Sequence, residues 1–311
     1  MAGVHPKRSL PKFAHESFTD WFARQPARNP EGERVLLWPD TFNDLFFPDN
    51  LKAATEVLQR FGYRVALPEM AVPAVRPLIH NGMLDPAKSE VRRIIRENNE
   101  DIRSGTAFVV LEPSTASVFR DDLSRLMPHD EDARRLSIQT STFGEFLMHR
   151  DHDLPRWERK AIIHGHCHDK SVLDFDAERN VLRKMGIEFE EPESGCCGMA
   201  GSFGYEADHY DISMKIGEMA LLPAVRKADS ETLIIASGFS CREQVLQGAG
   251  VEPMHLAQVV RKAMREADRQ DTEHRVQKSQ TTTSKRAAVA AGAIAAAAGA
   301  SAIVWKQRQG D

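Results

Sequence analysis

Cysteine is scarce in this sequence, with 4 residues among 311. That number is too small for the disulfide scaffold of a secreted domain, so we expect free thiols or metal ligands in a reducing compartment. Residues 1–30 also lack the apolar core of a secretory signal peptide, because they are polar and rich in Arg and Pro. The sequence therefore predicts a cytoplasmic protein.

An excess of charge of one sign is missing as well. The chain has 41 Lys and Arg against 45 Asp and Glu, a net charge of -4, which gives no electrostatic reason to expect nucleic-acid binding. Hydrophobic residues make up 41% of the chain, which is enough for a core and excludes a wholly disordered protein. At roughly 100–200 residues per domain, the length indicates two domains or one doubled unit.

Short apolar runs alternate with amphipathic segments along most of the chain. Strands are predicted at 34–38, 63–68, 106–113, 160–166, 187–192 and 231–238, and helices at 18–23, 50–61, 85–102, 177–185 and 210–226. This alternation predicts an α/β fold with mainly parallel sheets. The same order of elements returns after about 125 residues, which indicates a duplicated domain.

The repetition divides the chain into five predicted segments. A linker at 1–33 leads into a repeat at 34–150 that lacks cysteine. A second repeat, at 151–263, contains all four cysteines. A charged linker at 264–286 and an Ala-rich apolar tail at 287–311 follow.

The four cysteines are Cys167, the adjacent pair Cys196 and Cys197, and Cys241. Each lies in a loop beyond the carboxyl end of a predicted strand, and such loops converge on one crevice of a parallel sheet. Thiolates that converge in this way suit an iron–sulfur cluster or another thiophilic metal. When the two repeats are aligned by eye, no cysteine occupies the corresponding positions of the first, which is therefore predicted to be metal-free.

Glycines and histidines surround these cysteines. Gly195 and Gly198 flank the adjacent pair, where they would let the backbone turn tightly and direct N–H groups at a bound anionic cluster. His164, His166 and His168 alternate around Cys167. If the strand continues through them, they share the face opposite Cys167; if the chain turns there, one of them is a candidate ligand.

The segments HGHCHDKS, ESGCCGMAGSFGYEADHYDIS and ASGFSCREQ resemble the cysteine-rich (CCG) domain of iron–sulfur oxidoreductases. The resemblance covers roughly residues 3–263 and is greatest to the C-terminal region of FAD-linked 2-hydroxyacid dehydrogenases of the D-lactate, glycolate and 2-hydroxyglutarate type. It implies two tandem Rossmann-like CCG repeats that relay electrons from a flavin to an acceptor. It also implies that the four cysteines bind an iron–sulfur cluster, with [4Fe–4S] as the expected type.

The sequence departs from this family in two ways. The fullest family motif ends in CxxC, whereas Gly238 stands three residues before Cys241, so a five-thiolate non-cubane cluster is not expected. A ferredoxin-like cysteine run and a flavin domain are also missing from the sequence. The resemblance therefore implies a non-autonomous component of an oxidoreductase, with FAD and the ferredoxin-like module on a partner flavoprotein dehydrogenase.

Two alternatives remain open. Four thiolates with no open coordination position would also make a structural Zn²⁺ site in an assembly module without redox activity. A thiol enzyme with Cys196 or Cys197 as nucleophile would instead need an accessible thiol of low pKa.

The C-terminal region carries one long uncharged stretch. Residues 287–305 contain no charged side chain and would reach about 28 Å as a helix, close to the hydrocarbon thickness of a bilayer. The stretch consists mostly of Ala, which makes its insertion energy marginal. The sequence is consistent with membrane attachment through this tail and with an Ala-rich tail that stays in water.

Overall fold

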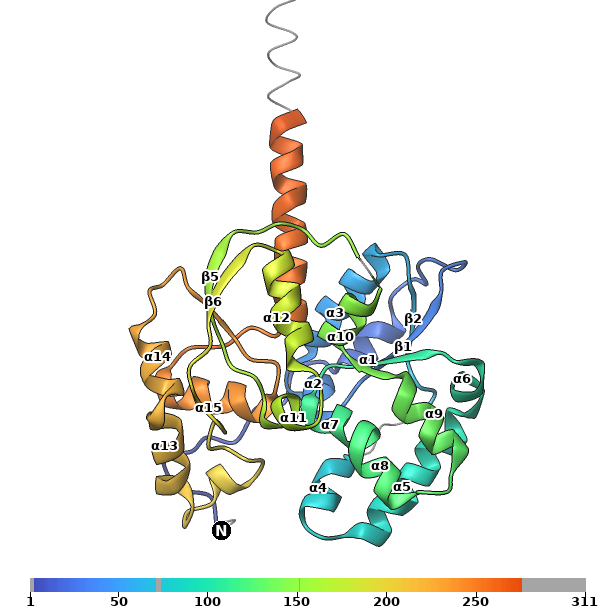
Figure 1. The fold of residues 1–311 in the computed structure, drawn as a ribbon, viewed down its shortest axis with the longest axis horizontal. Coiled ribbons are helices and arrows are strands. Elements are labelled where there is room, and N and C mark those ends of the chain that lie inside the picture. The colour runs from blue at the N-terminus through green and yellow to red at the C-terminus, as the bar shows by residue number, and fades with distance from the viewer. Residues whose placement is uncertain (1–2, 71–73, 151, 276–311) are drawn as a thin grey trace, which may run out of the picture. The chain divides into compact units, whose positions relative to one another are not determined.

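A computed structural model of the protein describes residues 3–70, 74–150 and 152–275. The chain forms two compact units, Met1–Ala263 and Met264–Asp311 (Figure 1). In the second unit, residues 264–275 of the predicted charged linker are helical, and the predicted Ala-rich tail at 287–311 lies outside the described residues. Within the described part of the chain, no helix has the length and apolar character that crossing a membrane requires.

The first sheet has four parallel strands in the order β2-β1-β3-β4. They are β1 (Arg34–Trp38), β2 (Arg64–Ala66), β3 (Ala107–Val110) and β4 (Thr140–Thr142). The central strand β1 has the sequence RVLLW, and its last four residues are buried. A continuous apolar run of this kind fits a strand whose two faces are both covered by helices.

The second sheet repeats this arrangement. Its parallel strands follow the order β6-β5-β7, with β5 (Arg159–Ile163), β6 (Ile187–Glu190) and β7 (Leu233–Ile235). Both members of the pair Val35 and Ala107 lie 126 positions before those of the pair Ala161 and Leu233. The predicted α/β class with parallel sheets and doubled strand order is therefore confirmed.

Helices connect the strands within each half. In the first half they are α1 (Phe18–Ala23), α2 (Thr41–Leu45), α3 (Pro48–Arg60), α4 (Val75–His80), α5 (Leu84–Glu97), α6 (Asn99–Ser104), α7 (Pro113–Ser117), η1 (Val118–Asp122), α8 (Leu123–Leu126), α9 (Glu131–Gln139) and α10 (Phe143–His149). In the second half they are α11 (Cys167–Ser171), α12 (Phe175–Lys184), η2 (Phe203–Tyr205), α13 (Tyr210–Met219), α14 (Leu221–Lys227) and α15 (Phe239–Ala249). Residues 256–263 are also helical.

Two helices predicted as continuous are divided. The segment 85–102 breaks at Asn98, whose side-chain amide donates to the carbonyl of Ile94 and so occupies an acceptor of the last turn of α5. The segment 210–226 breaks at Ala220, three residues before Pro223. Proline has no N–H to bond the fourth preceding carbonyl, so α13 ends and α14 starts anew.

The two halves pack against each other within the first unit. The ring of Phe42 in α2 stacks on that of Phe239 in α15, with 4.4 Å between their centroids. The backbone N–H of Phe239 donates to Glu112, the residue that caps α7, at 2.8 Å. The helices α7 and α11 are also in contact, near the centre of Figure 1. Because α2, α7, α11 and α15 each follow a strand, these contacts bring the carboxyl ends of both sheets together.

Candidate metal centre

The structure brings the four cysteines to one end of the second sheet. Cys167 is the first residue of α11, which follows β5. Cys196 and Cys197 lie in the loop between β6 and η2, and Cys241 is the third residue of α15, which follows β7. Each cysteine therefore follows the end of a strand as predicted, but Cys167 and Cys241 lie in the first turns of helices and not in loops.

Each of the four thiols has a pKa that is shifted by a neighbouring cysteine. Contact with Cys196 raises the pKa of Cys167, and contacts with Cys167 and then Cys197 lower the pKa of Cys196. Contacts with Cys196 and Cys241 raise the pKa of Cys197, and the contact with Cys197 lowers that of Cys241. Sulfurs this close together are a donor set for a thiophilic metal.

The exposure of the four side chains differs. Cys197 and Cys241 are buried, at 2% and 1% exposed, whereas Cys196 is half-buried and Cys167 is exposed. Cys167 also contributes to the wall of a cavity of about 490 Å³ between the two halves, together with Phe42 and Phe239. The site therefore has a closed inner side and one side that faces this cavity.

Backbone N–H groups converge on the adjacent cysteines. The N–H of Gly198 lies 3.3 Å from Sγ of Cys196, and that of Met199 lies 3.5 Å from Sγ of Cys197. Gly198 has φ +96°, and a Cβ there would stand 2.3 Å from the carbonyl oxygen of Ser213. Gly195 differs, because a Cβ would meet no described atom within 4 Å. Packing therefore demands glycine at position 198 and not at position 195.

The alternating histidines do not share one strand face. Strand β5 ends at Ile163, and the chain turns so that His166 becomes the N-cap of α11. Nδ1 of His166 accepts the N–H of His168 at 3.2 Å, while the carboxylate of Asp169 accepts the N–H of His166. The extended geometry considered for this segment is wrong, because the cap of α11 fixes a turn.

His164 lies beside the buried cysteines. Its side chain is 3% exposed, and one of its ring nitrogens lies within 4.8 Å of the sulfurs of both Cys197 and Cys241. Its Nδ1 is 3.0 Å from the hydroxyl of Ser194. Sequence spacing did not distinguish His164 from its two neighbours, because its position depends on where β5 ends.

Gly238 explains the departure from the CxxC motif. A Cβ at this position would stand 2.5 Å from Cδ2 of His166, so the imidazole fills the space of a side chain at position 238. A fifth thiolate there would collide with the ring unless the N-cap of α11 moved. The structure thus accommodates four cysteines and a histidine side chain where the fullest motif has five cysteines.

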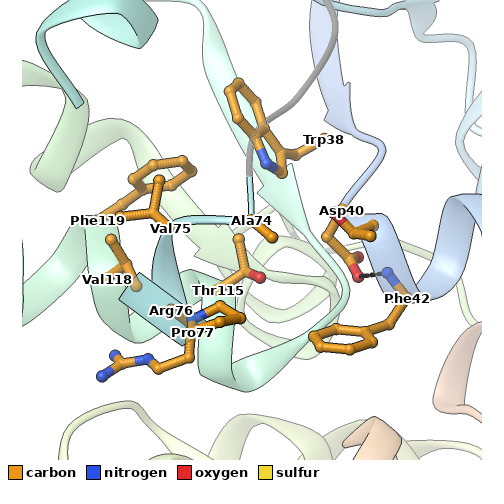
Figure 2. Close-up of a pocket in the computed structure, with 11 residues that line it drawn as sticks. Trp38, Asp40, Phe42, Ala74, Val75, Arg76, Pro77, Thr115, Val118 and Phe119 are labelled. Atoms are coloured by element: carbon orange, nitrogen blue, oxygen red, sulfur yellow. Dashed lines mark hydrogen bonds between the residues drawn. The ribbon is translucent and has the colours of Figure 1, made fainter. Parts of the chain in front are cut away.

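The corresponding place in the first half contains no cysteine and is largely filled by side chains. Figure 2 shows Trp38, Ala74 and Thr115 around a residual cavity of about 10 Å³. Trp38 and Thr115 stand 126 positions before His164 and Cys241. Trp38 is fully buried, and its ring packs edge-to-face with that of Phe119, with 5.0 Å between the ring centroids. Pro73 and Ala74 align by eye with Cys196 and Cys197, and Pro73 lies outside the described residues.

Buried carboxyl groups near the junction of the halves were not predicted. Burial raises the pKa of Glu112 to about 8 and that of Asp40 to about 6. Both residues cap helices, and in addition Glu112 accepts the N–H at the start of α15 from across the junction. Capping motifs in the sequence could have identified them as helix starts, but their burial depends on the packing of the two halves.

No family model matches the chain. The chain is similar to D-2-hydroxyglutarate dehydrogenase of Pantoea ananatis, with 22% identity over 237 residues that cover 73% of this chain and 22% of that protein. It is similar to a component of the anaerobic glycerol-3-phosphate dehydrogenase of Escherichia coli K12, with 22% identity over 84% of this chain and 67% of that component. It is also similar to lactate utilization protein A of Bacillus licheniformis, with 26% identity over 73% of this chain and 98% of that protein.

These relatives are dehydrogenases, a dehydrogenase component and a lactate utilization protein. The chain is therefore related to oxidoreductases and to components of oxidoreductase systems. It spans only 22% of the length of the D-2-hydroxyglutarate dehydrogenases of Pantoea ananatis and Pseudomonas putida.

Proposed function

We propose that the chain binds an iron–sulfur cluster, of the [4Fe–4S] type, through Cys167, Cys196, Cys197 and Cys241. In this proposal it is the electron-transfer component of an FAD-linked 2-hydroxyacid oxidoreductase. The observation that carries the proposal is the placement of all four cysteines after the carboxyl ends of β5, β6 and β7, where the neighbouring thiols shift one another's pKa. A cluster bound there would supply reversible one-electron chemistry.

The surrounding residues suit an anionic, thiolate-bound group. The N–H groups of Gly198 and Met199 donate toward Cys196 and Cys197, and Cys241 lies in the first turn of α15, where the helix dipole favours negative charge. The burial of Cys197 and Cys241 keeps water from the inner side. Hydrogen bonds to sulfur and exclusion of water are the means by which proteins tune cluster potentials.

The proposal includes a flavoprotein partner. The chain corresponds to a minor part of the D-2-hydroxyglutarate dehydrogenases it resembles, so FAD and a ferredoxin-like module would lie on a partner flavoprotein. Cys167 is the exposed thiol and faces the cavity between the halves, so a donor or acceptor would approach the centre most closely there. Cytoplasmic location and membrane contact through 287–305 stay predictions.

A structural zinc site is the second candidate. Four thiolates, two of them fully buried, would close a tetrahedral shell around Zn²⁺ and leave no position for substrate. The protein would then be an assembly module without redox activity.

Metal analysis of the anaerobically purified protein distinguishes the candidates. We expect iron and sulfide in near-stoichiometric amounts with iron–sulfur absorbance that dithionite bleaches. We expect Cys196→Ser to lose this absorbance. Zinc without sulfide would replace the proposal with the structural module. Protein that stays metal-free and is rapidly alkylated at Cys196 would indicate thiol chemistry instead.

The first half provides a matched control. Thr115 corresponds to Cys241 but lies at the cysteine-free site of Figure 2. Thr115→Ser should keep iron and sulfide at the wild-type level, whereas Cys241→Ser should lose them. Equal loss in both variants would mean that folding, and not metal ligation, accounts for the effect.

A further inference from the structure

Two ring nitrogens next to the cysteines, Nε2 of His164 and Nδ1 of His168, lack a hydrogen-bond partner among the described residues. Nε2 of His164 is buried, and no atom of the described residues meets hydrogen-bond geometry with it. An orphaned polar atom in a protein interior destabilises the fold, so its presence calls for a partner that binds there. The side chain is 3% exposed, which leaves little room for bulk water to serve.

The orientation of the ring is fixed from its other side. Nδ1 of His164 lies 3.0 Å from the hydroxyl of Ser194, and the backbone carbonyl of Ser194 is bound by the ammonium of Lys170 at 2.9 Å. Donation of Nδ1–H to this hydroxyl leaves the lone pair on Nε2. A histidine that donates one nitrogen to an oxygen and keeps the other free is the usual arrangement of a metal ligand.

Nε2 is the ring nitrogen that remains available to a metal near the sulfurs. One ring nitrogen of His164 and the sulfurs of Cys197 and Cys241 lie within 4.8 Å of one another, and Nδ1 is already engaged with Ser194. Nitrogen and sulfur ligands of one tetrahedral metal ion stand about 3.6 Å apart at ordinary bond lengths, and the ligands of different irons in a cluster stand farther apart. The three atoms are therefore near enough to one another to belong to a single metal centre.

We propose that His164 is a ligand of the metal centre through Nε2 and takes the place of one of the four thiolates, so that the centre is held by one imidazole and three cysteines. The inference rests on the metal centre of the proposed function and not on its electron-transfer role. It distinguishes His164 from His166, whose Nδ1 caps α11 and whose ring fills the space beside Gly238. It also distinguishes His164, beside the buried Cys197 and Cys241, from His168, which lies beside the exposed Cys167. Neutral imidazole in place of an anionic thiolate raises a cluster's reduction potential.

Pulsed electron paramagnetic resonance on the reduced protein tests this assignment. Protein with ¹⁵N-histidine should show the hyperfine coupling of a metal-bound imidazole nitrogen. His164→Gln should lose this coupling. His164→Cys should also lose it, keep the iron, and shift the reduction potential downward because a thiolate adds negative charge.

Two histidine variants serve as controls. His166→Asn retains an N-cap side chain for α11, and His209→Gln changes a partly exposed histidine paired with Glu206. Both should keep the nitrogen coupling. Coupling that persists in His164→Gln, or that disappears in His166→Asn alone, would overturn the assignment.

The outcomes separate this inference from the proposed function. An iron–sulfur centre without any nitrogen coupling leaves the proposed function intact and refutes the histidine ligand. A protein that binds zinc and no iron refutes the proposed function, and X-ray absorption of the zinc then decides between an all-sulfur shell and one with nitrogen. Failure of the wild-type protein to bind either metal after anaerobic reconstitution would refute both.

Discussion

Two glycines of the cysteine loop allow a sharp test of the packing around the metal centre. Gly198 and Gly201 both have positive φ, +96° and +66°. A left-handed conformation costs an L-residue about 1–2 kcal/mol, so alanine is unfavourable at either position. The two sites differ in space, because a Cβ at Gly198 would stand 2.3 Å from the carbonyl oxygen of Ser213, whereas at Gly201 no described atom lies within 4 Å.

The collision at Gly198 has no easy relief. The obstructing oxygen belongs to the backbone of α13 and accepts a hydrogen bond from Gln244 of α15 at 3.1 Å. Moving it would disturb the contact between these helices, and forced overpacking of this kind costs about 1–3 kcal/mol. We therefore expect Gly198→Ala to lower the free energy of unfolding by about 2–5 kcal/mol and Gly201→Ala by about 1–2 kcal/mol.

Urea unfolding of the reduced, metal-free proteins, followed by circular dichroism, measures this difference. After reconstitution, Gly198→Ala should also hold less metal than wild type, because the N–H that donates to Cys196 is displaced. Gly201→Ala should reconstitute normally. Equal destabilisation of the two variants would refute the reasoning, since only Gly198 is predicted to collide with Ser213.

Two further predictions concern buried charges. Arg8 is 6% exposed and donates three hydrogen bonds to the second half. Arg8→Met should therefore lower the free energy of unfolding, measured by urea titration, by about 2–4 kcal/mol. Arg24→Met, at the surface, should change this free energy by less than about 0.5 kcal/mol. Burial raises the pKa of Glu178 to about 7 from 4.5, so the folded state is destabilised as pH rises through this interval. Glu178→Gln should therefore have the free energy of unfolding of wild type near pH 4 and exceed it by at most about 3 kcal/mol above pH 7. A difference between the two proteins that stays constant from pH 4 to pH 7 would contradict the burial of the charge.

Local sequence determined most of the strands, five of the helical segments and the doubled order, whereas shorter helices such as α4, α9 and α10 were not predicted. The alternation of apolar runs with amphipathic segments predicted every strand from β1 to β3 and from β5 to β7, because these signals act over a few neighbouring residues. The three-residue strand β4 was not predicted, since its edge pairing with β3 depends on tertiary packing. The placement of the cysteines after three parallel strands also followed from sequence, because parallel strands direct their carboxyl ends to one edge.

Only the tertiary structure decided how the residues of the centre relate to one another. The end of β5 at Ile163 separates the roles of His164 and His166, and no pattern in HGHCH marks that end. Glycine is needed at position 198 because a Cβ would collide with Ser213 of α13. Glycine stands at position 238 because the ring of His166 occupies the space of a side chain there. These relations are distances between segments that are brought together by packing. The periodicity of a sequence predicts which face of a helix or strand a residue occupies. Which atoms the residue contacts there depends on how the sheets, helices and loops pack.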